Sequence, residues 1–108
     1  MAGPNPVYVS KAQIREAFNK QNFPEKLKNG SVSARLEGSE GLAPEHLGFP
    51  KGTKSRRMRY VAGNGKTVAI VHEYPVPGGG LAASGLPDPK QLIVGEALWI
   101  VDPSDKSP

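Results

Sequence analysis

Apolar and polar residues alternate most regularly in the second half of the chain. Residues 56–62 read Arg-Arg-Met-Arg-Tyr-Val-Ala, residues 67–74 read Thr-Val-Ala-Ile-Val-His-Glu-Tyr, and Asn64-Gly65 lies between them. Alternation with a period of two predicts strands with one buried face. Asn-Gly is the dipeptide that best favours a two-residue type I′ turn, because that turn needs positive φ at both positions. The sequence therefore predicts a β-hairpin closed at Asn64-Gly65.

The position of this turn predicts which residues of the two strands lie opposite each other. With a two-residue loop, Val61 pairs with Val68 and Arg57 pairs with His72. Alternation then sorts the side chains onto two faces, and a shift of one residue would break the grouping. One face is expected to hold Met58, Tyr60, Ala69 and Val71. The other face is expected to hold Arg57, Arg59, Val61, Val68, Ile70 and His72.

Before the hairpin the pattern is helical. Ser10 and Gln13 have the spacing of a capping box, and the apolar residues that follow share one face, which predicts a helix over residues 11–20. Pro24 can begin a second, short helix, which Asn29-Gly30 would end. The sequence therefore predicts two helices in the N-terminal part of the chain.

The predicted elements form one α+β domain that spans residues 1–108. Two apolar runs, 92–94 and 97–101, can pair as the last strands, and residues 31–36 alternate weakly enough to add one more. We expect N-terminal helices packed on an antiparallel β-meander of three to five strands, with flexible tails at 1–6 and 102–108. This layout resembles that of small microbial ribonucleases and of the ribonuclease toxins of toxin–antitoxin and bacteriocin systems. The resemblance implies that RNA cleavage is one function this arrangement can carry.

The amino-acid composition excludes several kinds of structural and metal-binding site. The 108 residues include no cysteine and two histidines, which excludes disulfides and thiolate metal sites and argues against a bound zinc ion. No apolar run is long enough to cross a membrane, and the first residues lack the basic and apolar regions of a signal peptide. We expect a cytoplasmic protein with no metal, no other cofactor and no membrane partner.

The charge is distributed unevenly along the chain. Residues 1–59 carry 11 Lys and Arg against 5 Asp and Glu, whereas residues 60–108 carry 3 against 5, and the whole chain has a net charge of +4. Such asymmetry indicates a side that faces a polyanion, although lysines that only solvate a small domain give the same total. RNA or another polyanion is therefore the first partner to consider.

The residues expected to hold phosphate groups cluster at the first strand of the hairpin: Lys51, Lys54, Arg56, Arg57 and Arg59. His72 is the candidate acid–base residue, because histidine titrates near neutral pH and the predicted register puts it beside two arginines. Together they could cleave a phosphodiester without a metal ion, as in a toxin-type ribonuclease. The alternative is that His72 is a structural residue of the strand and that the protein binds RNA without cleaving it.

The segment Pro75–Lys90 is rich in glycine and proline and predicts a long loop. In a second, non-enzymatic hypothesis this loop is the recognition surface of a protein-interaction or inhibitor module, with Tyr74, Leu81 and Leu86 as apolar anchors. Tyr60, Tyr74 and Trp99 could also stack on bases. Because aromatic residues make up only 6% of the chain, we expect Trp99 in the core and leave the place of Tyr74 open.

Overall fold

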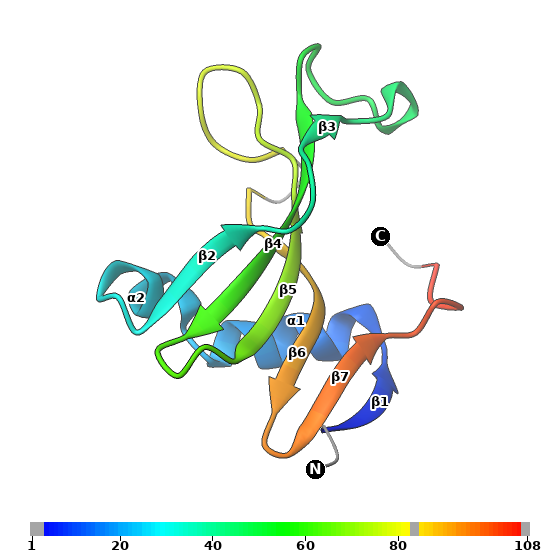
Figure 1. The fold of residues 1–108 in the computed structure, drawn as a ribbon. Coiled ribbons are helices and arrows are strands. Elements are labelled where there is room, and N and C mark those ends of the chain that lie inside the picture. The colour runs from blue at the N-terminus through cyan, green and yellow to red at the C-terminus, as the bar shows by residue number, and fades with distance from the viewer. Residues whose placement is uncertain (1–3, 83–84, 107–108) are drawn as a thin grey trace.

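The structure, a computed structural model, describes residues 4–82 and 85–106 and is an α+β fold with two α-helices and a mixed sheet (Figure 1). The elements follow one another as β1 (Asn5–Val9), α1 (Lys11–Lys20), α2 (Phe23–Lys28), β2 (Val32–Leu36), β3 (Gly41–Leu42), a 3₁₀ turn η1 (Glu45–Leu47), β4 (Lys54–Ala62), β5 (Thr67–Glu73), β6 (Asp88–Val94) and β7 (Ala97–Val101). None of the helices within these residues is long and apolar enough to span a membrane.

The sheet is larger than the sequence predicts. Its strands lie in the order β1-β7-β6-β5-β4-β2, and β3 adds a short pairing to β4, which makes seven strands where three to five are expected. The chain also does not begin with helices, because β1 precedes them and pairs in parallel with β7. Residues Asn5 and Pro6 therefore belong to the sheet and not to a flexible tail. The expected tail residues 1–3 and 107–108 lie outside the described part of the chain.

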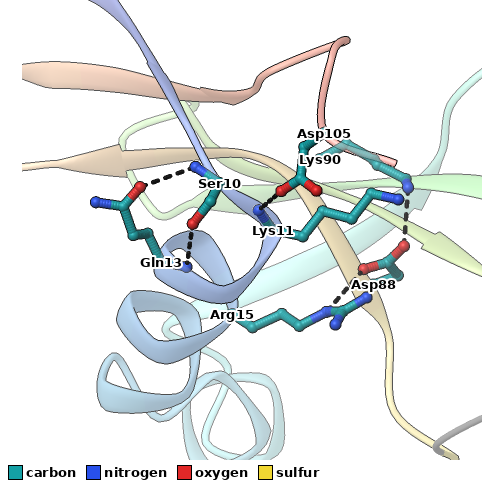
Figure 2. Close-up of polar contacts among 7 residues, drawn as sticks. All are labelled: Ser10, Lys11, Gln13, Arg15, Asp88, Lys90 and Asp105. Carbon is teal, nitrogen blue, oxygen red and sulfur yellow. Dashed lines mark hydrogen bonds and ion pairs between the residues drawn. The ribbon is translucent and has the colours of Figure 1, made fainter. Parts of the chain in front are cut away.

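Both helices begin and end where local sequence signals place them. The Ser10 hydroxyl accepts a hydrogen bond from the Gln13 N–H at 3.1 Å, and the Gln13 side chain accepts one from the Ser10 N–H at 2.9 Å, so the predicted capping box is confirmed (Figure 2). The second helix begins at Phe23, one residue before the predicted Pro24, and ends at Lys28 with Asn29 as its C-cap. Asn22, which precedes it, has φ 54°, a left-handed conformation that lets the chain turn sharply between the two helices.

The hydrophobic core lies between the helices and one face of the sheet, the face that we call the helix side. Its buried side chains come from both helices and from five strands: Val9, Ile14, Phe18, Phe23, Val32, Tyr60, Ala69, Val71 and Leu92. Figure 1 shows α1 running along this side of the sheet, behind β5 and β6 in the view. Trp99 is partly buried and packs against this cluster, as expected. The other side of the sheet carries no helix, and we call it the open face.

The hairpin of β4 and β5 keeps most of its predicted register but has a different turn. Ala62 accepts a hydrogen bond from the Gly65 N–H and donates one to Lys66, so the loop has three residues and Val61 pairs with Thr67. Only Gly65 in this loop has positive φ, at 86°, so the turn is not type I′. A bulge between Tyr60 and Val61 restores the predicted pairs from there on, and Arg57 does lie opposite His72.

The bulge corrects one assignment of face. Val68 is the extra residue on β5, and it packs against the core instead of joining the open face. The remaining residues of the hairpin lie as predicted. Tyr60, Ala69 and Val71 are buried in the core with Met58 packed against them, and the opposite face carries Arg57, Arg59, Val61, Ile70 and His72.

The segment predicted as one long loop, Pro75–Lys90, is shorter and more ordered. Its last three residues belong to β6, where Pro89 pairs with Val71. Proline has no N–H to donate to a neighbouring strand. It is tolerated at position 89 because β6 pairs with β7 only from Gln91 onward, so Pro89 has no hydrogen-bond partner on β7. The first part doubles back on itself, with a bridge between Pro75 and Leu81. Residues 83–84 lie outside the described part of the chain.

Polar contacts fasten the C-terminal segment to the start of α1 (Figure 2). The Asp105 carboxylate accepts a hydrogen bond from the Lys11 N–H at 2.7 Å, which satisfies one of the free donors at the helix N-terminus. Asp88 pairs with Lys90 at 2.8 Å and with Arg15 at 3.5 Å. Residue 105 is therefore a structural contact, although it falls in the range expected to be a flexible tail.

Candidate nucleic-acid interface

The five basic residues singled out in the sequence do not form one patch. Side chains alternate along β4, so Lys54 and Arg56 project to one side and Arg57 and Arg59 to the open face. Lys51 lies before the strand, exposed to solvent. Only two of the five, Arg57 and Arg59, therefore share a face with His72.

Lys54 and Arg56 are neutralised by acidic neighbours. Arg56 donates to the Glu73 carboxylate at 2.8 Å and lies 3.6 Å from Glu40, and Lys54 lies 3.3 Å from the same Glu40. The Glu73 side chain is only 11% exposed, so its pairing with Arg56 lies mostly out of water. Two positive and two negative groups balance one another here, and these two cations offer little free charge to a phosphate.

A third arginine joins the open face from β2. Arg35 lies directly opposite Arg59 in the antiparallel ladder, and both side chains are exposed. Among the described residues neither guanidinium has a hydrogen-bond or ion-pair partner. Residues directly opposite have Cβ atoms about 5 Å apart, so two like charges at this spacing repel and destabilise the sheet. No acidic side chain among the described residues offsets this repulsion.

Arg57 continues this basic stripe, which comprises Arg35, Arg57 and Arg59. It lies 3.4 Å from Glu37, which balances part of its charge, and its side chain is about half exposed. Sequence reasoning missed Arg35 because residues 31–36 alternate only weakly. The pairing of β2 with β4 is a long-range contact that no local pattern reveals. One sequence signal could have located Arg35: it lies three residues after Val32 in the same strand, so the two side chains point to opposite faces.

His72 lies beside the stripe and has two direct partners. Its Nε2 lies 2.7 Å from the Ser55 hydroxyl, and its ring stacks on Tyr74 with centroids 4.5 Å apart. Burial lowers the pKa of His72, the positive charges of Lys90 and Arg57 lower it further, and Asp88 opposes them. The imidazole is therefore neutral at pH 7, with one nitrogen able to accept a proton.

Asp88 does not complete a Ser-His-Asp triad. It lies opposite His72 in the ladder between β5 and β6, but its carboxylate pairs with Lys90 and Arg15. The Ser55 hydroxyl and His72 thus form a polar pair without a carboxylate to orient the imidazole. This arrangement suits hydrogen bonding to a ligand, or proton transfer by His72 alone, better than nucleophilic attack by serine.

Apolar side chains extend the open face away from the stripe. Val61 and Ile70 are 4% and 8% exposed although no helix covers them and they lie outside the core cluster. Half-buried Ile93, Leu98 and Ile100 continue this surface across β6 and β7. Tyr8 on β1 lies opposite Ile100 and is 61% exposed. The open face therefore combines the basic stripe with an apolar surface formed by side chains of β6, β7 and β1.

The three residues proposed as anchors of an interaction loop have different surroundings. The Tyr74 ring stacks on His72 and lies tilted against Phe49, with the second pair of centroids 4.9 Å apart. Leu81 is half-buried and forms the bridge to Pro75. Leu86 is 59% exposed and lines a pocket on the helix side of the sheet. The loop hypothesis therefore stays a prediction.

No group of three or more His, Asp or Glu side chains that could hold a metal ion occurs in residues 4–82 and 85–106. Comparison with known proteins adds no function: no family model, no curated protein and no solved structure matches this chain. The open face and its geometry therefore carry the functional argument.

Proposed function

We propose that this protein binds single-stranded nucleic acid, with RNA as its natural ligand, across the open face of the sheet. The observation that carries the proposal is the cross-strand pair Arg35–Arg59, two exposed guanidinium groups with no carboxylate partner among the described residues. A phosphate backbone supplies the negative charge that this pair lacks, and arginine binds phosphate through two parallel hydrogen bonds. Arg57 extends the same stripe toward His72.

A single strand fits this surface better than a duplex. Single-strand binders combine a positive track for the backbone with apolar or aromatic surface on which bases can lie. The open face offers such surface beside the stripe, from the half-buried Ile93 across to Ile100 and the exposed Tyr8 ring. The Ser55–His72 pair supplies a donor and an acceptor next to the stripe, and a 2′-hydroxyl can use both, which favours RNA over DNA.

Metal-free cleavage is a second candidate, supported by the state of His72. A neutral imidazole beside arginines can accept the proton of a 2′-hydroxyl, whose oxygen bonds to phosphorus while the arginines stabilise the charge that develops on the phosphate; the P–O5′ bond breaks, and solvent water protonates the 5′-oxygen. The test is incubation of labelled RNA with EDTA. Cleavage that produces 2′,3′-cyclic phosphate ends and is lost in His72→Ala supports an enzyme. If the RNA is bound but stays intact, the protein is a binding module and not a ribonuclease.

The binding test compares an open-face double variant with a matched control. Replacing Arg35 and Arg59 by alanine removes two charges from the stripe, and replacing Lys20 and Lys28 by alanine removes two charges from exposed positions on the helices. For single strands the logarithm of affinity falls with the logarithm of salt with a slope of about −0.7 per phosphate contact. If the stripe makes three contacts, affinity drops roughly 20-fold between 50 and 200 mM salt, and the arginine variant reduces this to about 3-fold.

Fluorescence anisotropy with a labelled 12-nucleotide RNA measures both slopes. The proposal expects the helix variant to keep the steep slope and the arginine variant to lose it. Equal weakening by both variants would mean that only overall charge matters. A partner that is captured from lysate after nuclease treatment, through Leu81 and Leu86 and independently of the arginines, would favour the protein-interaction hypothesis.

A further inference from the structure

A pocket of about 310 Å³ lies on the helix side of the sheet, away from the open face. The rings of Phe18, Phe23 and Tyr60 form part of its wall, and Leu27 and Leu86 contribute aliphatic surface. The ring centroids of Phe18 and Phe23 are 4.8 Å apart, and those of Phe23 and Tyr60 are 5.3 Å apart. The aromatic side chains that complete the core thus also line a space open to a ligand.

One polar group in this pocket is open to a ligand. Tyr60 lines the pocket, and its hydroxyl makes no hydrogen bond to any residue that the structure describes. A hydroxyl can both donate and accept a hydrogen bond, so a ligand in the pocket can pair with it.

A carboxylate oxygen lines the same pocket. Glu73 receives both of its contacts from Arg56, through Nε and through Nη2, on one oxygen, Oε1, at 2.8 Å each. Its second oxygen, Oε2, has no hydrogen-bond partner within residues 4–82 and 85–106. The carboxylate therefore keeps one acceptor for a ligand while Arg56 holds it in place.

Glu73 is the acidic residue among those that line the pocket. Burial raises the pKa of Tyr60 to about 12; the negative charge of Glu73 adds to the rise, and the positive charge of Arg56 opposes it. Aromatic faces attract cations through their quadrupoles. This cluster already does so at its edge, where Lys26 Nζ lies 5.2 Å from the centroid of the Phe23 ring.

We propose that this pocket binds a small planar organic cation of the amidinium or guanidinium class. One N–H group of the ligand donates to Glu73 Oε2, a second donates to the Tyr60 hydroxyl, and the flat body of the ligand lies against Phe18 and Phe23. A pocket of this volume is large enough for one ring with one substituent. The cation can be a free small molecule or the arginine side chain of a peptide. The site is independent of the nucleic-acid interface proposed above.

The experiment titrates the whole protein with benzamidine and with benzamide, its neutral isostere, followed by two-dimensional amide NMR. A charge-assisted hydrogen bond is about twice as strong as a neutral one, so benzamidine should bind at least about tenfold more tightly than benzamide. The shifted resonances should be those of the pocket, among them Asn19 and Asn22. N-acetylarginine amide, titrated in parallel, distinguishes an arginine side chain from a free aromatic cation as the better ligand.

Two variants and one control locate the binding. Glu73→Gln should abolish the preference for benzamidine, and Tyr60→Phe should weaken binding about threefold or more while the ring packing and the melting temperature are kept. Glu40→Gln removes the same charge from the other carboxylate that holds Arg56 but does not line the pocket, so it should leave the preference intact. If Glu73→Gln fails to fold, Tyr60→Phe still tests the proposal, because it preserves the core.

Three outcomes would overturn this assignment. The first is equal binding of benzamidine and benzamide, which would show that the carboxylate takes no part. The second is an equal loss in the Glu40 and Glu73 variants, which would reduce the effect to general electrostatics. The third is the absence of any shift at the pocket amides at millimolar benzamidine.

Discussion

Replacing Arg35 by glutamate should make the protein more stable and at the same time remove its affinity for RNA. Arg35 and Arg59 face each other across β2 and β4, exposed to solvent, with no acidic partner among the described residues. In Arg35→Glu the like-charge contact becomes an opposite-charge contact. Such cross-strand pairs contribute about 0.2–1 kcal/mol, and like charges cost a similar amount, so the total gain is about 1 kcal/mol.

The gain is measured by thermal and urea unfolding. For a domain of this size about 1 kcal/mol corresponds to a rise in Tm of roughly 4 °C. The effect should shrink as salt is added, because the Debye length falls from about 10 Å at 0.1 M to about 3 Å at 1 M. Arg35→Gln removes the repulsion without adding an attraction and should lie between the two proteins.

A double-mutant cycle isolates the pair from other effects of the substitutions. Arg59→Glu alone should also stabilise, whereas the double variant again has two like charges and should lose both gains. If Arg35→Glu is no more stable than Arg35→Gln at low salt, the two side chains do not interact as described. The argument that the pair persists for the sake of binding would then fail.

Three further changes test other parts of the structure. Ser10→Ala removes the cap of α1 and should cost about 1 kcal/mol of stability, measured by urea unfolding, whereas an unchanged midpoint would mean that the cap is dispensable. Gly65→Ala should destabilise the protein by about 1–2 kcal/mol, because Gly65 has φ 86°. Gly63→Ala is the control and should have little effect, because the φ of Gly63 is not positive and an added Cβ would meet no atom within 4 Å. Equal losses of stability in the two variants would contradict the turn geometry. The folded-state pKa of His72 lies below its unfolded value, so the unfolded chain binds the proton first and stability should fall as the pH drops below about 6.5, until the folded-state pKa is passed. His72→Gln should flatten that part of the profile of unfolding free energy against pH, and a profile that stays the same would contradict the burial of the ring.

The sequence by itself determined the structural features that depend on residues close together in the chain. The capping box at Ser10 needs only residues three apart, and the helix that follows has the predicted bounds. The alternation of β4 and β5 fixed which side chains share a face, so Arg57, Arg59 and His72 come together as predicted. These features depend on backbone geometry and on side chains close in sequence, which a single pattern encodes.

The turn shows where local reasoning reaches its limit. The dipeptide Asn64-Gly65 did predict a hairpin, but Gly63 offers a three-residue loop that competes with the two-residue one. The bulge beside Tyr60 then absorbs the extra residue, because the core holds Ala69 and Val71 in place further along the strand. Burial of those side chains thus corrects the register that the turn alone would have shifted.

Only the tertiary structure decided which residues form the candidate site. Lys54 and Arg56 read as equal members of a basic cluster, yet Glu40, from the loop between β2 and β3, and Glu73, opposite Arg56 on β5, neutralise them. Arg35 became part of the stripe because β2 adds to the edge of the sheet beside β4. The strand β1 likewise pairs with β7, whose residues lie 92 positions further along the chain. Hydrogen bonds and ion pairs between remote segments carry no local periodicity, and for that reason the sequence could indicate a basic strand but not its free charges.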